Sequence, residues 1–187
     1  MLSTESMSSF CNRFIHAGIV RKKGETRWCK IINSIWNVLT FHTNDDDFMR
    51  RASTLCGHIY MSQDWEYSDK TLTHTYVLLK HEAAHLRFFK ETGPILGLLI
   101  YFLFPLPIGL AYGRYYIERK AIIDELLAID ATGGNTLDRL NVYVRALAGW
   151  SYFFAWPFKV SIRSWLTREF LRRKHPAMTF YGRDTFL

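Results

Sequence analysis

The sequence is poor in cysteine and contains no paired cysteine motif. Among its 187 residues only three are cysteine, and Cys11, Cys29 and Cys56 include no CxxC spacing. An odd number without that spacing argues against a disulfide framework and against a cysteine-based zinc site. We therefore expect free thiols in a reducing compartment.

The chain also lacks internal repeats, low-complexity segments and a secretory signal. Residues 1–9 are polar, without the basic start and apolar stretch of a signal peptide, which predicts a cytoplasmic protein. Hydrophobic residues make up 49% of the chain, so it folds, and its length indicates one domain over residues 1–187. The 24 basic against 17 acidic residues give a net charge of +7, which favours acidic partners without identifying one.

The first part of the chain has the character of strands. Residues 14–20, 27–32 and 57–61 are runs of β-branched or aromatic residues, which predict three strands. Gly24 lies in a polar turn between the first two runs, and this placement predicts a hairpin.

The later part has the periodicity of helices. We expect helices near residues 69–91, 112–132, 135–148 and 160–174, with Gly93 ending the first and Asn135 capping the third. Strands followed by helices predict an α+β fold. In this prediction residues 1–65 are mainly strands and form a small N-terminal sheet. Residues 69–187 are mainly helices, a bundle that carries the motif described next.

The predicted helix over residues 69–91 contains the motif HExxH. His81 and His85 are four residues apart, so their imidazoles lie on one helix face where a single zinc ion can meet both. Glu82 projects about 100° away, beside the metal and outside its ligand positions. From there it can take a proton from a water on the metal. Apolar neighbours indicate that the helix is buried, where unliganded polar side chains are costly.

A catalytic zinc site needs a third protein ligand. The residues after His85 do not continue as HxxGxxH, which excludes the metzincin class. A carboxylate of the helix over residues 112–132 is the remaining source. Glu118 is the best candidate, because the small Ala121 on the same helix permits close packing; Asp124 is the other choice.

These motifs resemble the gluzincin metallopeptidases, especially their minigluzincin-like members. The resemblance covers roughly residues 56–125, with the stretch HIYMSQDW (residues 58–65), the HEAAH helix, an apolar connection and the sequence ERKA, and it extends weakly to residues 151–158. In this family a strand precedes the HExxH helix. The resemblance implies that the strand borders a substrate cleft, that His81, His85 and Glu118 bind Zn²⁺, and that Glu82 is the general base. One departure is Ile122, where many members of this family have an acidic residue; Asp124 or Glu125 would then support a histidine ligand.

Two hypotheses for the function follow. The first is a zinc-dependent metallopeptidase that hydrolyses peptide bonds of a peptide or protein substrate through a metal-activated water. The alternative is an inert protein of the same fold that has a structural or interaction role in a larger assembly. The donor for the oxyanion stays open among Tyr112, Tyr143, Tyr152 and His175. His74, seven residues before His81, is either a cleft residue or a partly buried structural histidine.

Two further segments concern possible partners. Residues 93–112 carry no charge and are long enough to span a bilayer, but one crossing would separate His85 from Glu118. With Pro105 and Pro107 in this run, we expect a buried helix and an extended turn, with a membrane-embedded hairpin as the second choice. The basic helix over residues 160–174 can bind an acidic partner, whereas no nucleic-acid module is recognisable.

Overall fold

The computed structural model describes residues 2–27, 29–31, 34, 52–55, 57–103, 112–149 and 157–176. The chain divides into two compact units, Met1–Leu98 and Leu99–Leu187. The described part is mostly helical with one small sheet, in agreement with an α+β fold.

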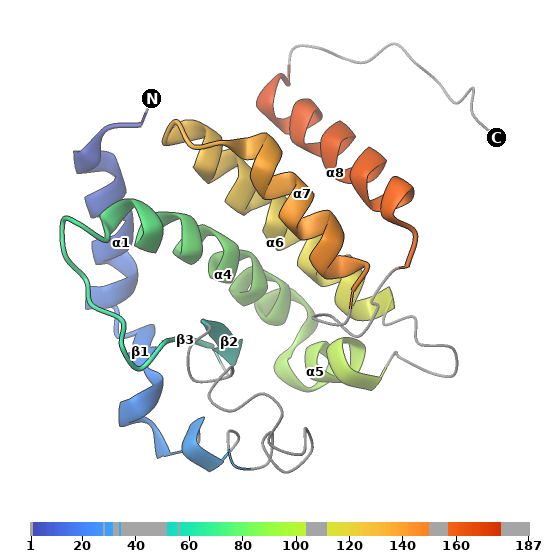
Figure 1. Ribbon diagram of the computed structural model, residues 1–187. Helices are drawn as coiled ribbons and strands as arrows, with labels where there is room; N and C mark the ends of the chain where they lie inside the picture. Colours follow the sequence, from blue (N-terminus) through green and yellow to red (C-terminus); the bar gives the residue numbers. More distant parts are fainter. Residues whose placement is uncertain are drawn as a thin grey trace. The chain divides into compact units, whose positions relative to one another are not determined.

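The first unit contains a three-stranded sheet and two long helices (Figure 1). Its elements are α1 (Thr4–His16), β1 (Val20–Lys22), the 3-10 helix η1 (Lys23–Glu25), β2 (Ser53–Leu55), β3 (His58–Met61) and α4 (Leu72–Thr92). The strand order is β1-β3-β2, in which β3 runs parallel to β1 and antiparallel to β2. Both α1 and the strands β2 and β3 pack against α4, so this helix is the centre of the unit.

The predicted strand over residues 14–20 is wrong except at its end. Helix α1 continues through His16, and its N-terminus is capped by Ser3, whose side chain accepts a hydrogen bond from the Ser6 amide at 3.2 Å. Met7 and Cys11, four residues apart, form its buried face, so the helical period outweighs the local β propensity. Only Val20 enters a strand.

The predicted hairpin around Gly24 is also wrong. Residues 23–25 form η1, and β1 pairs with β3 instead of with the residues that follow Gly24. That pairing is parallel, whereas a hairpin joins two antiparallel strands. Residues 29–31 are helical, whereas we expected a strand over residues 27–32. The strand predicted over residues 57–61 is confirmed as β3.

Helix α4 agrees with its prediction. It begins after Thr71 and ends at Gly93, whose φ of 85° is a conformation that favours glycine. Its N-terminal half packs on α1, where the Phe10 and Tyr76 rings meet edge to face with centroids 5.3 Å apart.

Helix α5 (Pro94–Leu103) begins the apolar run, and part of it is exposed. The exposed fractions of Ile95, Leu96 and Leu99 are 76%, 52% and 43%, so the expectation of a buried helix is wrong for this face. The predicted turn at Pro105 and Pro107 lies outside the described residues. Among the described helices, none combines the length and apolar character that a membrane crossing requires.

In the second unit α6 (Tyr112–Ala131), α7 (Thr136–Leu147) and α8 (Lys159–Lys174) lie side by side (Figure 1). All three confirm their predictions. The Asn135 side chain caps α7 by accepting from the Asp138 amide at 3.2 Å. The core between these helices consists of buried apolar residues that include Ile122, Leu126, Val144, Leu147, Ile162 and Leu166.

We expect Leu147→Ala to lower the free energy of unfolding by about 2–5 kcal/mol, because Leu147 is fully buried in this core. Leu137→Ala on the same helix is the matched control, since Leu137 is 65% exposed, and its effect should stay within about 0.5 kcal/mol. Urea unfolding followed by circular dichroism measures both changes. Equal effects of the two substitutions would contradict the described packing of α7.

Candidate metal centre

The two histidines of the HExxH motif face each other on α4. Their Nε2 atoms are 3.1 Å apart, and the ring centroids are 4.9 Å apart with the planes at 68°. Two nitrogen ligands of one tetrahedral zinc ion, each about 2.0–2.1 Å from the metal, lie roughly 3.3 Å apart. His81 and His85 therefore have the spacing that a shared zinc ion requires, and both are almost fully buried.

Glu82, the residue between them in the motif, is also buried, with an exposed fraction of 4%. The Thr54 hydroxyl of β2 lies 2.7 Å from the Glu82 Oε2 atom, to which it donates a hydrogen bond. It also lies 3.2 Å from the Glu82 backbone oxygen. Thr54 thus fixes the orientation of the carboxylate from a neighbouring element.

Sequence reasoning missed Thr54. Strand β2 has only three residues and was not predicted, and Thr54 precedes Glu82 by 28 residues. The contact arises because β2 pairs with β3 and both strands pack on α4. A lone threonine carries no motif that would have identified it.

His74 has no part in this arrangement. It is exposed on α4, which contradicts a partly buried structural role, whereas a position in a cleft stays a prediction. The next residue, Thr75, is buried, and its hydroxyl accepts a hydrogen bond from the Trp65 indole at 3.2 Å.

The predicted carboxylates lie on α6, in the second unit. Glu118 is buried at 3% exposure, and Ala121, one turn later, is fully buried. Asp124 forms an ion pair with Arg173 of α8 at 2.8 Å, and Glu125 one with Arg139 of α7 at 3.4 Å. Asp124 and Glu125 are therefore held by cations of their own unit, which makes each less suited to bind a metal ion.

Tyr143 belongs to the network of Glu125 and Arg139. Its hydroxyl accepts a hydrogen bond from the Arg139 Nε atom at 3.1 Å. Burial, and then the Glu125 carboxylate, raise the pKa of Tyr143, so this hydroxyl stays protonated at neutral pH. Of the other candidate oxyanion donors, His175 is exposed after α8, whereas the side chains of Tyr112 and Tyr152 lie outside the described residues.

Cys11 and Cys29 are free and buried, as predicted for thiols without partners. Burial raises the pKa of the Cys11 thiol to about 11, which leaves it protonated at neutral pH. Cys56 lies outside the described residues.

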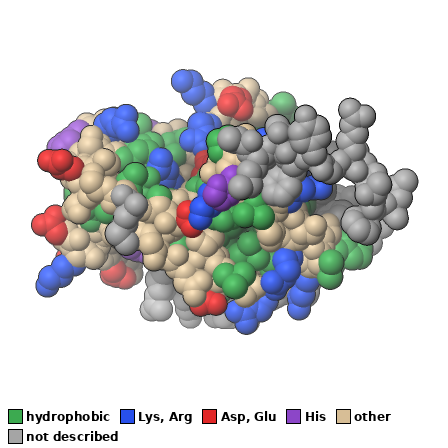
Figure 2. Space-filling model, turned by 90° about the horizontal axis from the view of Figure 1, so that it is seen from above, with side chains coloured by type: hydrophobic (Ala, Val, Ile, Leu, Met, Phe, Trp, Pro, Cys, Tyr) green, Lys and Arg blue, Asp and Glu red, His purple; other side chains and the backbone are tan. Residues whose placement is uncertain are grey.

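The last three basic residues of α8 form ion pairs within the second unit. Arg172 and Arg173 bind Glu169 at 2.6 and 2.8 Å, and Lys174 binds Asp130 at 2.7 Å. Hydrogen bonds from Arg172 lower the pKa of Glu169 to about 2. On the face drawn in Figure 2, Lys and Arg side chains occur at several separate places among hydrophobic and acidic ones. Binding of an acidic partner to α8 stays a prediction.

Comparison with protein-family models gives no match, and comparisons with curated proteins and with solved structures give none either.

Proposed function

We propose that the protein is a zinc-dependent metallopeptidase-like hydrolase of the gluzincin type, in which His81, His85 and Glu118 hold Zn²⁺. The observation that carries the proposal is the pair of buried Nε2 atoms 3.1 Å apart on α4, with buried Glu82 between them in sequence. The proposal includes one metallopeptidase-like domain, with a small N-terminal sheet followed by a helical bundle that carries the HExxH helix.

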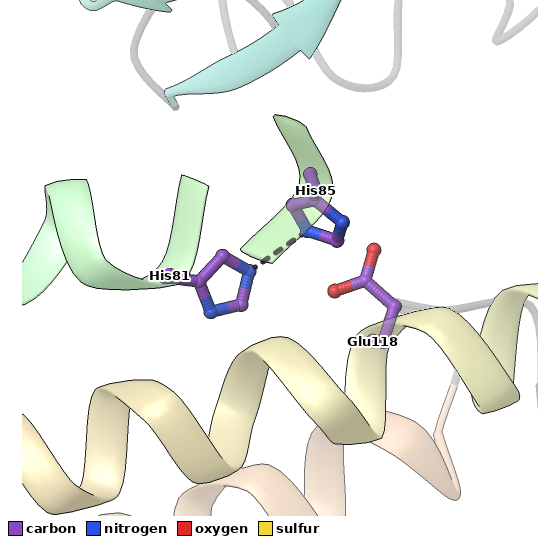
Figure 3. A group of neighbouring side chains, drawn as sticks. All are labelled: His81, His85 and Glu118. Atoms are coloured by element: carbon purple, nitrogen blue, oxygen red, sulfur yellow. Dashed lines mark hydrogen bonds between the residues drawn. The ribbon is translucent and has the colours of Figure 1, made fainter. Parts of the chain in front are cut away.

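Glu118 is the proposed third ligand. In this proposal Glu118 would offer one carboxylate oxygen, and His81 and His85 one imidazole nitrogen each, to the same ion; Figure 3 draws the three side chains. Neutral imidazole nitrogens and a carboxylate oxygen are the donors of many catalytic zinc sites. Glu118 belongs to the other compact unit, so the zinc affinity of a Glu118 variant directly tests this part of the proposal.

The residues of the chain then have distinct roles. When bound, zinc would lower the pKa of a water toward about 7 and polarise the substrate carbonyl. Glu82 would accept the proton of the attacking water and deliver it to the leaving amine. Thr54 would hold the Glu82 carboxylate in the orientation that this transfer requires.

The experiment that tests the proposal is zinc-dependent cleavage of a mixed peptide library, read by mass spectrometry. We expect products with the zinc-loaded chain and none after the metal is removed by a chelator. Return of zinc to the chelated sample should restore the products. A folded, zinc-loaded chain that cleaves no peptide would contradict the proposal.

That contradictory outcome would support the alternative, an inert protein of metallopeptidase fold within a larger assembly. One observation favours it. Ile122 is fully buried in the core of the second unit, at the position where many gluzincins have an acidic residue that supports a histidine ligand. A site without that support binds its metal more weakly.

We expect Thr54→Val to reduce peptide cleavage by about tenfold or more, with zinc content unchanged, because Glu82 loses its hydrogen-bond donor. Thr54→Ser keeps the hydroxyl and should retain most of the activity. The exposed Thr73 on α4 gives the control variant Thr73→Val, which should behave as the wild type. Equal kcat values for Thr54→Val and the wild type would show that Thr54 does not position Glu82.

A further inference from the structure

We propose that the exposed face of α5 binds the surface of an anionic lipid membrane. This face consists of Ile95, Leu96 and Leu99, with exposed fractions of 76%, 52% and 43%. The sequence of α5, PILGLLIYFL, contains no charged residue. Contiguous exposed apolar side chains of this kind mark interaction surfaces.

Packing on one side of α5 directs this face outward. Gly97 is buried, and a Cβ atom at its position would lie 2.5 Å from the Phe89 ring of α4. Ile95 and Leu99 are each two residues from Gly97. Two steps of about 100° turn the helix by about 200°, which places both side chains roughly 160° around the helix from that contact. The close approach at Gly97 therefore fixes which side of α5 is exposed.

The chemistry of the segment favours lipid over a protein partner. Protein interfaces combine an apolar centre with polar groups that fix how the two partners are aligned. The side chains of α5 include no charged or amide group for that purpose. A lipid surface requires only an apolar helix face with cations nearby. Lys90 is exposed near the end of α4, shortly before α5 begins and next to the exposed Glu91, and the whole chain has a net charge of +7. This net positive charge favours anionic over neutral headgroups.

The length of α5 indicates how it would bind. Ten residues make a helix about 15 Å long, half of the roughly 30 Å hydrocarbon core. The helix would therefore lie in the plane of the membrane surface with Ile95, Leu96 and Leu99 among the headgroups and upper acyl chains. This binding mode is independent of the proposed peptidase activity.

Flotation of the full-length chain with phosphatidylcholine vesicles, with and without phosphatidylserine, tests this proposal. We expect the wild type to float with the phosphatidylserine vesicles. The triple variant Ile95→Ser, Leu96→Ser and Leu99→Ser should partition at least about tenfold less, because it loses the apolar groups that enter the lipid. The control is Leu137→Ser, Val142→Ser and Val160→Ser, which removes three exposed apolar side chains from α7 and α8 and should bind as the wild type.

Three results would overturn the proposal. The first is a wild type that binds neither kind of vesicle. The second is an α5 variant, folded by circular dichroism, that still binds as the wild type, since the contact would then be electrostatic or lie elsewhere. The third is dimerisation in solution that the α5 substitutions abolish while vesicle binding is absent, which would assign the face to a second copy of the chain.

Discussion

Glu82→Gln should abolish peptide cleavage while zinc stays bound. The amide keeps the size of the side chain and can still accept the Thr54 hydrogen bond at its oxygen, but it cannot take a proton from water. Loss of a positioned general base costs on the order of a thousandfold in rate. Steady-state cleavage of a peptide found in the library experiment, together with zinc content by mass spectrometry, measures both effects.

The matched control for this substitution is Glu91→Gln, an exposed glutamate near the end of the same helix. It removes the same charge from α4 without touching the motif, so cleavage should persist. If Glu82→Gln cleaved as fast as Glu91→Gln, Glu82 would not be the base and the proposed mechanism would be wrong.

Zinc binding should fail when a histidine of the motif is removed. We expect His85→Ala, and likewise His81→Ala, to lower the zinc affinity by more than about a hundredfold. Substitution of residues that only support the ligands already lowers metal affinity by about 10–100-fold, and loss of a ligand should lower it further. Competition with a chromophoric chelator gives the affinity of each variant. The wild type should bind about one zinc ion per chain.

His74→Ala is the control for the histidine variants, since His74 is exposed on the same helix. It should bind zinc as the wild type does. Circular dichroism shows whether each variant is folded, so that loss of metal is not confused with loss of structure. Wild-type zinc affinity in folded His85→Ala would exclude His85 as a ligand.

The sequence predicted the helices better than the strands, for a physical reason. The bounds of α4, α6, α7 and α8 depend on local features, such as the Asn135 cap and the glycine at position 93. The sheet depends on pairing between β1 and β3, whose first paired residues, Val20 and Ile59, lie far apart along the chain. No local pattern specifies such pairing, and so the strand predicted over residues 14–20 overlapped the end of α1, and the predicted hairpin was wrong.

The same distinction applies to the candidate site. His81, Glu82 and His85 were identified because their spacing on one helix is local and the chemistry of the motif follows from it. Thr54 was missed because its contact with Glu82 depends on how β2 packs against α4. The exposure of α5 was also missed, since an apolar sequence does not show which of its faces the rest of the chain covers.

The central claim is that Glu118 completes a zinc site with His81 and His85, and its most direct test is the zinc affinity of Glu118→Gln. Titration against a competing chelator should show an affinity loss of more than about tenfold, because an amide oxygen is a poorer zinc ligand than a carboxylate. Asp124→Asn, on the same helix, should leave the affinity unchanged, since Asp124 instead pairs with Arg173. A folded Glu118→Gln variant with wild-type zinc affinity would contradict the account.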